Sequence, residues 1–91
     1  SVCNGAMVLA ELEVLDGLTV TTHHGSFENL RRRAPKATVV EDRKWVDNGK
    51  IITAAGVSSG IDATIHLIER LHGQELARDV ERYIEYTRRT D

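Results

Sequence analysis

Apolar and polar positions change their period several times along this chain, and each change predicts an element. Residues 4–14 are apolar nearly all round, which predicts a helix buried on several sides and ended by Asp16-Gly17. Residues 18–22 and 37–40 are rich in β-branched side chains, which predicts two strands. A short helix from Phe27 to Arg33 is expected between them.

The second half of the sequence predicts a hairpin and then two helices. Asp47-Asn48-Gly49 is a turn signal whose Asn-Gly pair tolerates positive φ, so we expect arms at 44–46 and 51–53. A helix over about 60–71 should follow, with Ser59 and Asp62 as a capping box, and a last helix should begin near Gln74. The predicted apolar stripes are Ile61, Ile65, Ile68 and Leu71, then Leu76, Val80, Tyr83 and Ile84.

Strands that alternate with helices predict an α/β layered domain with a mostly parallel sheet. Parallel sheets are covered on both faces, whereas only about four short strands are expected here. The first helix would also need burial on a side for which the sequence offers no partner. We therefore expect the chain to be the C-terminal part of a larger domain, either a fragment or one chain of a cleaved pair.

The segment Ser1-Val2-Cys3-Asn4-Gly5 places the only cysteine directly before the first predicted helix. A cysteine between a strand and a helix occupies the position of a nucleophile elbow. Backbone N–H groups and the helix dipole favour a thiolate there, and the N–H of Asn4 can receive an oxyanion. Only two residues precede Cys3, so we expect the strand that carries it to lie outside this chain.

Composition narrows the class of protein. A chain of 91 residues forms at most one small domain, and a net charge of −2 argues against a broad attraction to nucleic acid or membranes. No apolar run approaches the roughly 20 residues that span a bilayer. One cysteine cannot form an internal disulfide, so a reducing, cytoplasmic setting is expected. Arg31-Arg32-Arg33 is interpreted as a solvated helix end.

Two more segments complete a pattern that resembles a known family. Thr-Thr-His ends the first strand at His23, and residues 45–62 read Trp-Val-Asp-Asn-Gly-Lys-Ile-Ile-Thr-Ala-Ala-Gly-Val-Ser-Ser-Gly-Ile-Asp. With the segment around Cys3, essentially the whole chain resembles the C-terminal half of the ThiJ/PfpI superfamily, which is similar to class I glutamine amidotransferases. The pattern is most similar to the isocyanide hydratase-like branch. The ligand-sensing domains of some AraC-type regulators share it.

The resemblance implies a flavodoxin-like three-layer sandwich, with residues 1–91 as the C-terminal half of a single domain that commonly forms a homodimer. It implies that Cys3 is the nucleophile and that His23 lies near its sulfur. Asn4, Gly5 and His24 would belong to the oxyanion site or the pocket. The acidic residue that activates the cysteine, and the second oxyanion N–H, would come from the absent N-terminal half. No cofactor or metal is implied.

Two positions depart from the pattern of the hydratase-like branch. Asn4 stands where that branch often has threonine, whose hydroxyl assists the chemistry, and this departure weakens the case for the hydratase reaction itself. His24 stands where tryptophan is common, which indicates a more polar pocket wall.

Structural roles are predicted for several other polar or aromatic residues. We expect Glu28 and Arg32 to form a solvated pair, and His66 to form a surface pair with Asp62. Structural roles are also expected for Trp45, which packs or forms an interface, for His72 at a helix end, and for Gly56 and Gly60 beside a helix start.

Three functions follow from this sequence. The first is a cysteine-dependent enzyme in which Cys3 attacks a small electrophilic carbon, with isocyanide hydration as the named reaction. Glyoxalase- or deglycase-like chemistry and peptide or amide hydrolysis belong to the same superfamily. The second is a non-catalytic ligand-sensing domain, although the chain carries no helix-turn-helix segment after its last predicted helix. The third is a redox sensor that oxidises Cys3 reversibly.

Overall fold

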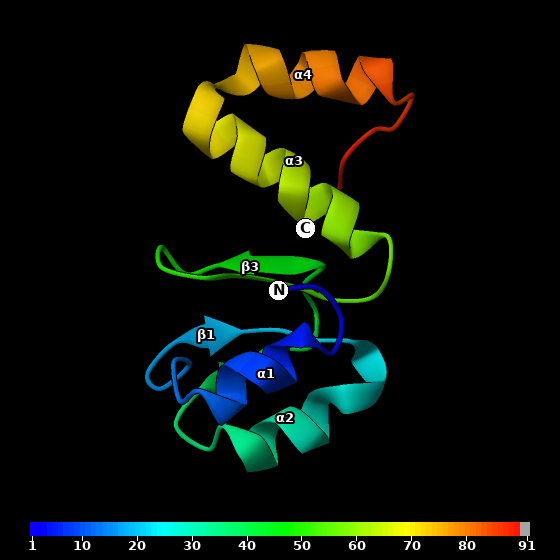
Figure 1. Cartoon of the computed structure of the whole chain (residues 1–91). Helices are drawn as coiled ribbons and strands as arrows, with labels where there is room; N and C mark the ends of the chain where they lie inside the picture. The colour runs from blue at the N-terminus through cyan, green and yellow to red at the C-terminus, as the bar shows by residue number, and fades with distance from the viewer. Residues whose placement is uncertain (90–91) are drawn as a thin grey trace.

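A computed structural model describes residues 1–89 and arranges them as an α/β protein in three layers (Figure 1). The strands lie in the middle layer, with α3 and α4 on one side and α1 and α2 on the other. The helices are α1 (Gly5–Glu11), the 3-10 turn η1 (His24–Ser26), α2 (Phe27–Arg33), α3 (Ser59–His72) and α4 (Gln74–Tyr83), and the strands are β1 (Thr19–Val20), β2 (Thr38–Val39), β3 (Trp45–Asp47) and β4 (Ile52–Ala54).

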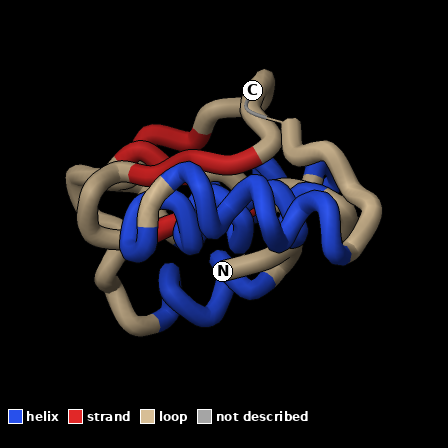
Figure 2. The backbone as a smooth tube through the Cα atoms, turned by 90° about the horizontal axis from the view of Figure 1, so that it is seen from above, coloured by secondary structure: helices blue, strands red, loops and turns tan. Residues whose placement is uncertain are grey.

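The strands form one parallel and one antiparallel pair. β1 pairs with β2 in parallel, joining Thr19 to Thr38, as expected for strands linked through a helix. β3 pairs with β4 in antiparallel register, with Trp45 opposite Ala54. In the view from above, strand segments lie next to one another, alongside the helices (Figure 2). The buried N–H of Thr21 donates to Thr53 Oγ1 at 2.9 Å, which fastens the chain after β1 to the hairpin.

Two apolar clusters hold the outer layers against the strands. The larger cluster lies under α1 and α2 and consists of Ala6, Ala10, Leu15, Val20, Leu30 and Ala34. The smaller one lies under α3, where Trp45 and Ala54 of the hairpin meet Ala63. Small alanines at these contacts let the helices approach the strands closely, so short strands still bury side chains on both faces.

The first helix is shorter and less buried than predicted. α1 ends at Glu11 because Glu13 takes a positive φ of 58°, so the left-handed residue comes before Asp16-Gly17. Only Ala6 and Ala10 of α1 are buried, whereas Val8 is 62% exposed. The predicted burial on several sides is therefore absent within the described part of the chain.

The hairpin is shifted by one residue from the predicted arms, and its loop has four residues. Residues 48–51 connect β3 to β4, and of the Asn48-Gly49 pair only Gly49 has a positive φ, 91°. Asn48 Oδ1 instead accepts the N–H groups of Lys50 and Ile51 at 3.1 and 2.9 Å. The Asn-Gly signal located the turn correctly, but the asparagine acts through its side chain rather than through a left-handed backbone.

Three predicted polar contacts are wrong. Ser58 occupies the N-cap of α3 without a side-chain hydrogen bond, so Ser59 and Asp62 form no capping box. Glu28 pairs with Arg31 at 2.6 Å rather than with Arg32, and the same guanidinium also bonds Glu41 and the Val39 carbonyl oxygen. His66 turns toward β3 instead of toward Asp62, as described below.

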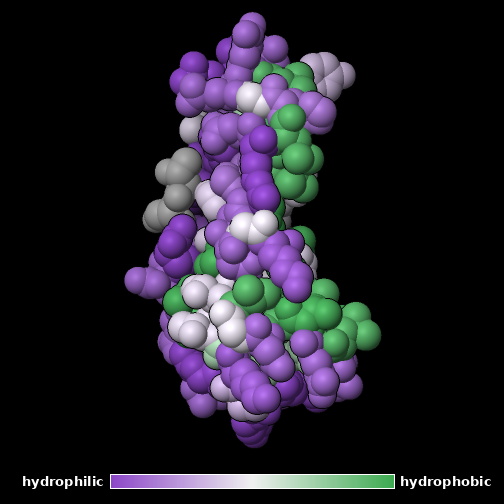
Figure 3. Space-filling view, turned by 90° about the vertical axis from the view of Figure 1, so that its left-hand side faces the viewer, coloured by the Kyte–Doolittle hydropathy of each residue, from purple (hydrophilic) through white to green (hydrophobic). Residues whose placement is uncertain are grey.

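Hydrophobic side chains gather along one edge of the molecule, both above and below the level of the strands (Figure 3). The large apolar residues that are at least half exposed are Val8, Leu12, Val57, Leu71 and Tyr83. None of the described helices is both long enough and apolar enough to cross a membrane.

Candidate functional site

Cys3 lies on a strained turn between a strand contact and a helix. Val2 bridges to Ala54 in parallel, and α1 begins at Gly5, two residues after Cys3. Cys3 itself has a φ of 51°, which costs a residue with a Cβ atom roughly 1–2 kcal/mol. The chain therefore supplies a strand contact before the cysteine, although the sequence led us to expect none, and it has the backbone shape of an elbow.

Both backbone polar groups of Cys3 are held by neighbouring segments. The Cys3 N–H donates to the carbonyl oxygen of Ala55 at 3.1 Å. The hydroxyl of Thr22 donates to the Cys3 carbonyl oxygen at 2.8 Å, and Thr22 is fully buried. These two bonds come from the ends of different strands, so the packing of the sheet maintains the strained φ.

Cys3 and Asn4 each keep a polar group that no described residue engages. The thiol is partly exposed, and no residue within 1–89 hydrogen-bonds its sulfur. The N–H of Asn4 is likewise unbonded within these residues, while the Asn4 side-chain oxygen accepts the Ser26 hydroxyl at 2.7 Å. The Asn4 side chain therefore fixes the turn, and its N–H is available to an incoming oxygen. A side chain at Gly5 would meet Ser1 at 3.3 Å, so the close approach there favours glycine.

His23 follows Thr22 and has a defined ring orientation. Its Nδ1 accepts the N–H of Gly25 at 3.1 Å, which places the proton of the neutral ring on Nε2. The Cδ2 and Nε2 edge faces Gly56, at 3.6 and 3.9 Å from where a Cβ of that residue would lie. The His23 ring therefore packs in van der Waals contact with this loop, and the neutral ring presents an Nε2–H donor on that side.

A pocket of about 420 Å³ opens beside His23. It lies between the residues after β1, the loop before β3 and the loop before α3. Its lining consists of His23, His24, Phe27, Glu41, Asp42, Arg43, Lys44, Ala55, Gly56, Val57, Ser58 and Ser59. The exposed His24 ring lies 4.2 Å from the His23 ring, centroid to centroid.

The predicted site residues are thus brought into one neighbourhood but not into mutual contact. Cys3, Asn4 and Gly5 are absent from the described lining of this pocket, whereas His23 and His24 belong to it. Ala55 connects the two parts, because its carbonyl oxygen accepts the Cys3 N–H and the residue also lines the pocket. Thr22 and Ser59 were missed by the sequence interpretation. Thr22 stood in the quoted Thr-Thr-His segment, and Ser59 had been assigned to a cap.

A second polar cluster joins the hairpin to α3. His66 Nε2 lies 2.7 Å from Asp47 Oδ2, and the His66 ring stacks on Trp45 with centroids 4.0 Å apart. The bond from His66 lowers the pKa of the Asp47 carboxyl, and the Gly49 N–H and the nearby Arg70 lower it further, against the opposing effect of desolvation. This cluster explains why Trp45 packs, as predicted, and it corrects the expected pair of His66 with Asp62.

Asp62 is buried and receives the C-terminal segment instead. Its Oδ1 accepts the Tyr86 hydroxyl at 2.9 Å and the Arg89 N–H at 2.7 Å. The hydrogen bond to Asp62 raises the pKa of the Tyr86 phenol. Asp62 therefore anchors the segment after α4 to the start of α3.

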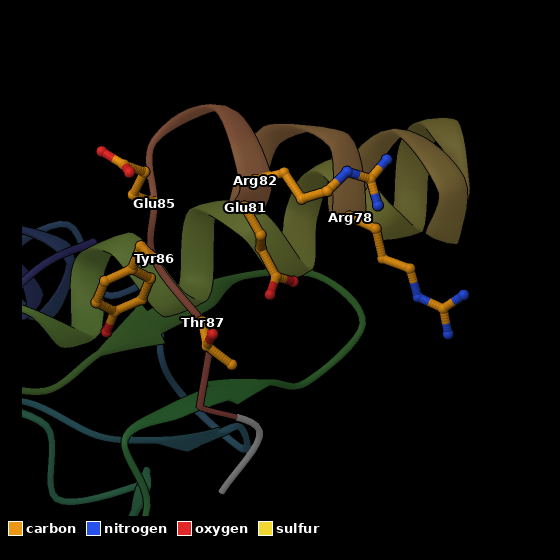
Figure 4. A pocket seen from close by; sticks show the side chains of 6 residues that line it. All are labelled: Arg78, Glu81, Arg82, Glu85, Tyr86 and Thr87. Carbon is orange, nitrogen blue, oxygen red and sulfur yellow. The ribbon is translucent and has the colours of Figure 1, made fainter.

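A pocket of about 290 Å³ near that segment offers no comparable chemistry (Figure 4). Its polar side chains include Glu81, which points inward, and Tyr86, which points toward α3. Glu81 lies 3.6 Å from Arg88, and Arg82 pairs with Asp79. These groups are engaged in holding α4, which leaves the His23 pocket as the stronger candidate.

Comparisons with known proteins agree with this architecture. The sequence profile described as the DJ-1/PfpI family matches residues 1–70. Over 84% of this chain, the sequence is 36% identical to the HTH-type transcriptional regulator CdhR of Pseudomonas aeruginosa. Over 94% of this chain, it is 35% identical to the isonitrile hydratase of Pseudomonas putida. A crystal structure of a ThiJ/PfpI family protein from Pseudomonas syringae superimposes with a TM-score of 0.85 at 26% identity, over 98% of this chain.

The chain spans only part of each of these proteins. It covers 22% of the regulator, 36% of the hydratase and 36% of the Pseudomonas syringae chain. The layered arrangement in Figure 1 is accordingly that of the flavodoxin-like fold of these neighbours.

Proposed function

This chain belongs to the DJ-1/PfpI family, and from that premise we propose that it carries the nucleophile of a cysteine-dependent, isonitrile hydratase-like enzyme. Cys3 is the proposed nucleophile, and His23 with its neighbour His24 forms a wall of the substrate pocket. The observation that carries the proposal is the φ of 51° at Cys3, maintained by Thr22 and Ala55 on a turn from strand contact to helix. Strain of this kind at a reactive side chain is typical of functional sites.

The proposed reaction adds water to an isonitrile in two stages. The Cys3 thiolate attacks the terminal carbon of R–N≡C, a C–S bond forms, and a proton is taken up at that carbon to give a thioimidate. Water then attacks the same carbon, one of its protons goes to the nitrogen and the other is released, which balances the proton taken up in the first stage, while the C–S bond breaks and the thiolate leaves. The product is the N-formamide R–NH–CHO, and no oxidant or cofactor is consumed. Backbone N–H groups, including that of Asn4, would stabilise the developing negative charge.

The test is turnover of a small isonitrile by the full-length protein and by Cys3→Ala. We expect formamide from the native protein and none from the variant, with the same thermal unfolding midpoint in both. Turnover retained by Cys3→Ala would contradict the nucleophile assignment. Methylglyoxal and a small amide serve as parallel substrates, because glyoxalase-like and amidase activities are the alternatives that use the same cysteine.

A second candidate function is a ligand-sensing domain, which the similarity to a transcriptional regulator supports. A sensor requires binding without chemistry, so Cys3 would then contact a ligand or respond to oxidants. Ligand binding by the native protein with no consumption of that ligand would favour the sensor. Reversible oxidation of Cys3 at low peroxide, accompanied by a change in ligand or DNA binding, would favour the redox version.

We also propose that the exposed face of α1 packs against an N-terminal half of the same domain. Val8 and Leu12 are 62% and 65% exposed on that helix, and the chain covers 36% of the hydratase it resembles. That half would supply the acidic residue and the second oxyanion N–H, and the assembled domain would form a homodimer. Hydrogen exchange of α1, compared with and without the additional segment, tests the packing. Unchanged protection of α1 would contradict it.

A further inference from the structure

Ser59 combines deep burial with an unused hydroxyl. The residue is only 5% exposed and lies at the first position of α3, where its N–H donates to the Gly56 carbonyl oxygen at 2.7 Å. Its hydroxyl makes no hydrogen bond within residues 1–89. No buried side-chain oxygen or nitrogen of the described residues lacks a partner, so the Ser59 hydroxyl must retain some accessible surface. Ser59 is one of the residues that line the His23 pocket.

The loop that carries Ser59 is fixed by the elbow and by His23. Ala55 accepts the Cys3 N–H, Gly56 lies against the His23 ring, and a Cβ at Gly60 would come within 2.9 Å of Val2. Ser59 therefore stands on a segment whose two ends are packed against the residues before and at Cys3. A group bound at Ser59 would be held at a defined position relative to the elbow.

Ser59 and His23 can each offer a hydrogen-bond donor in the lining of this pocket. The His23 Nδ1 is occupied by the Gly25 N–H, so the neutral ring offers its Nε2–H on the Gly56 side. The formal charges of the four charged lining residues sum to zero, because Glu41 and Asp42 are negative and Arg43 and Lys44 are positive. A hydroxyl and an Nε2–H in a lining whose formal charges balance favour a neutral oxygen acceptor over an ion or a purely apolar group.

We propose that Ser59 is a specificity-determining residue that, with His23, binds a carbonyl oxygen of the substrate. This inference rests on the proposed function and narrows it. The preferred substrate is a small molecule that bears a carbonyl group within a few bonds of the carbon that Cys3 attacks.

Binding can be tested without turnover by using Cys3→Ala in the full-length protein. Three probes are compared by titration calorimetry: ethyl isocyanoacetate, hexyl isocyanide, which has the same number of non-hydrogen atoms, and isocyanoacetate. The ester carries a neutral carbonyl, the hexyl compound carries none, and the free acid carries a carboxylate. We expect the ester to bind several-fold more tightly than the hexyl compound, and the acid to bind no more tightly than the ester.

Ser59→Ala in the same background should reduce the preference for the ester by about 2- to 10-fold, the effect of losing one hydrogen bond. Its folding should be unaffected, because the hydroxyl has no partner among residues 1–89. Ser59→Thr should retain the preference. Thr64→Ala is the control, since the Thr64 hydroxyl lies on the same helix, bonds the Gly60 carbonyl oxygen and is outside the lining of the His23 pocket, and it should leave the preference unchanged.

Equal binding of the ester and the hexyl compound by the Cys3→Ala protein would overturn the inference, and so would an unchanged preference in Ser59→Ala. Tighter binding of the free acid would overturn the choice of a neutral carbonyl. A Ser59-dependent preference in a protein that never turns over an isonitrile would support the site while contradicting the proposed enzyme, so the two failures are distinguishable.

Discussion

The Thr22 hydroxyl donates a hydrogen bond of 2.8 Å to the carbonyl oxygen of Cys3, and thereby connects the end of β1 to the strained turn. Thr22 is fully buried, so its hydroxyl has no water as an alternative partner. In Thr22→Val the Cys3 carbonyl loses its donor while the shape of the core is nearly kept. We expect a loss of about 1–2 kcal/mol in the free energy of unfolding and slower alkylation of Cys3 by iodoacetamide.

Thr21 provides the control for that prediction. It is equally buried, and its hydroxyl donates to the Val40 carbonyl oxygen at 2.9 Å, away from the elbow. Thr21→Val should lose similar stability by chemical denaturation and alkylate at the native rate. Equal slowing of alkylation in both variants would mean that Thr22 acts through general stability and not through the elbow.

The positive φ of Cys3 predicts an unusual order of stability among its variants. Cys3→Ala keeps a Cβ at a φ of 51° and keeps the strain, whereas Cys3→Gly relieves it. Glycine also makes the unfolded chain more flexible, which offsets part of the gain. We expect Cys3→Gly to be at least as stable as Cys3→Ala, by up to about 1 kcal/mol, with neither variant active. A glycine variant less stable than alanine in urea denaturation would show that the turn is unstrained.

The cluster of Asp47 and His66 predicts a stability that depends on pH. Since the folded protein lowers the pKa of Asp47, this contribution is present above the ordinary aspartate range and is lost as the pH falls through the lower, folded value. The native protein should exceed Asp47→Asn by about 1–2 kcal/mol near neutral pH. The difference should shrink in acid well below about pH 4. Urea denaturation of both proteins at several pH values measures it.

Asp79 is the matched control for Asp47, because it pairs with Arg82 on an exposed part of α4. Exposed pairs contribute little, so Asp79→Asn should change stability by less than about 0.5 kcal/mol at any pH. A constant difference between the native protein and Asp47→Asn across the acid range would contradict the assigned role of the carboxylate.

At Gly60, α3 packs closely against Val2, the residue before the proposed nucleophile. A Cβ at this position would lie 2.9 Å from Val2 Cγ1, so Val2 must move in Gly60→Ala. The expected cost is about 1 kcal/mol, because overpacking exceeds the gain in helix propensity. Alkylation of Cys3 should also change, since Val2 is its neighbour. Adding Val2→Ala removes the clash and should restore both properties; a double variant no better than the single one would contradict this packing.

The order and type of the elements, the position of the hairpin turn and the elbow at Cys3 were determined by the sequence alone. These features depend on neighbours a few residues apart, such as the β-branched run before Thr22 or the apolar run after Gly5, and local periodicity is sufficient to predict them. The family resemblance pointed to the same cysteine, Cys3, and also to His23. The match to residues 1–70 confirms the family.

Only the tertiary structure decided which polar groups meet. His66 pairs with Asp47, nineteen residues away, and the nearer Asp62 receives Tyr86 and Arg89 from the end of the chain. Ser59, assigned to a cap by its spacing, instead lines a pocket with an unused hydroxyl. Such partners are chosen by which surfaces pack together, and a buried charge or hydroxyl accepts whichever group the packing brings within reach. Helical spacing carries no information about that choice.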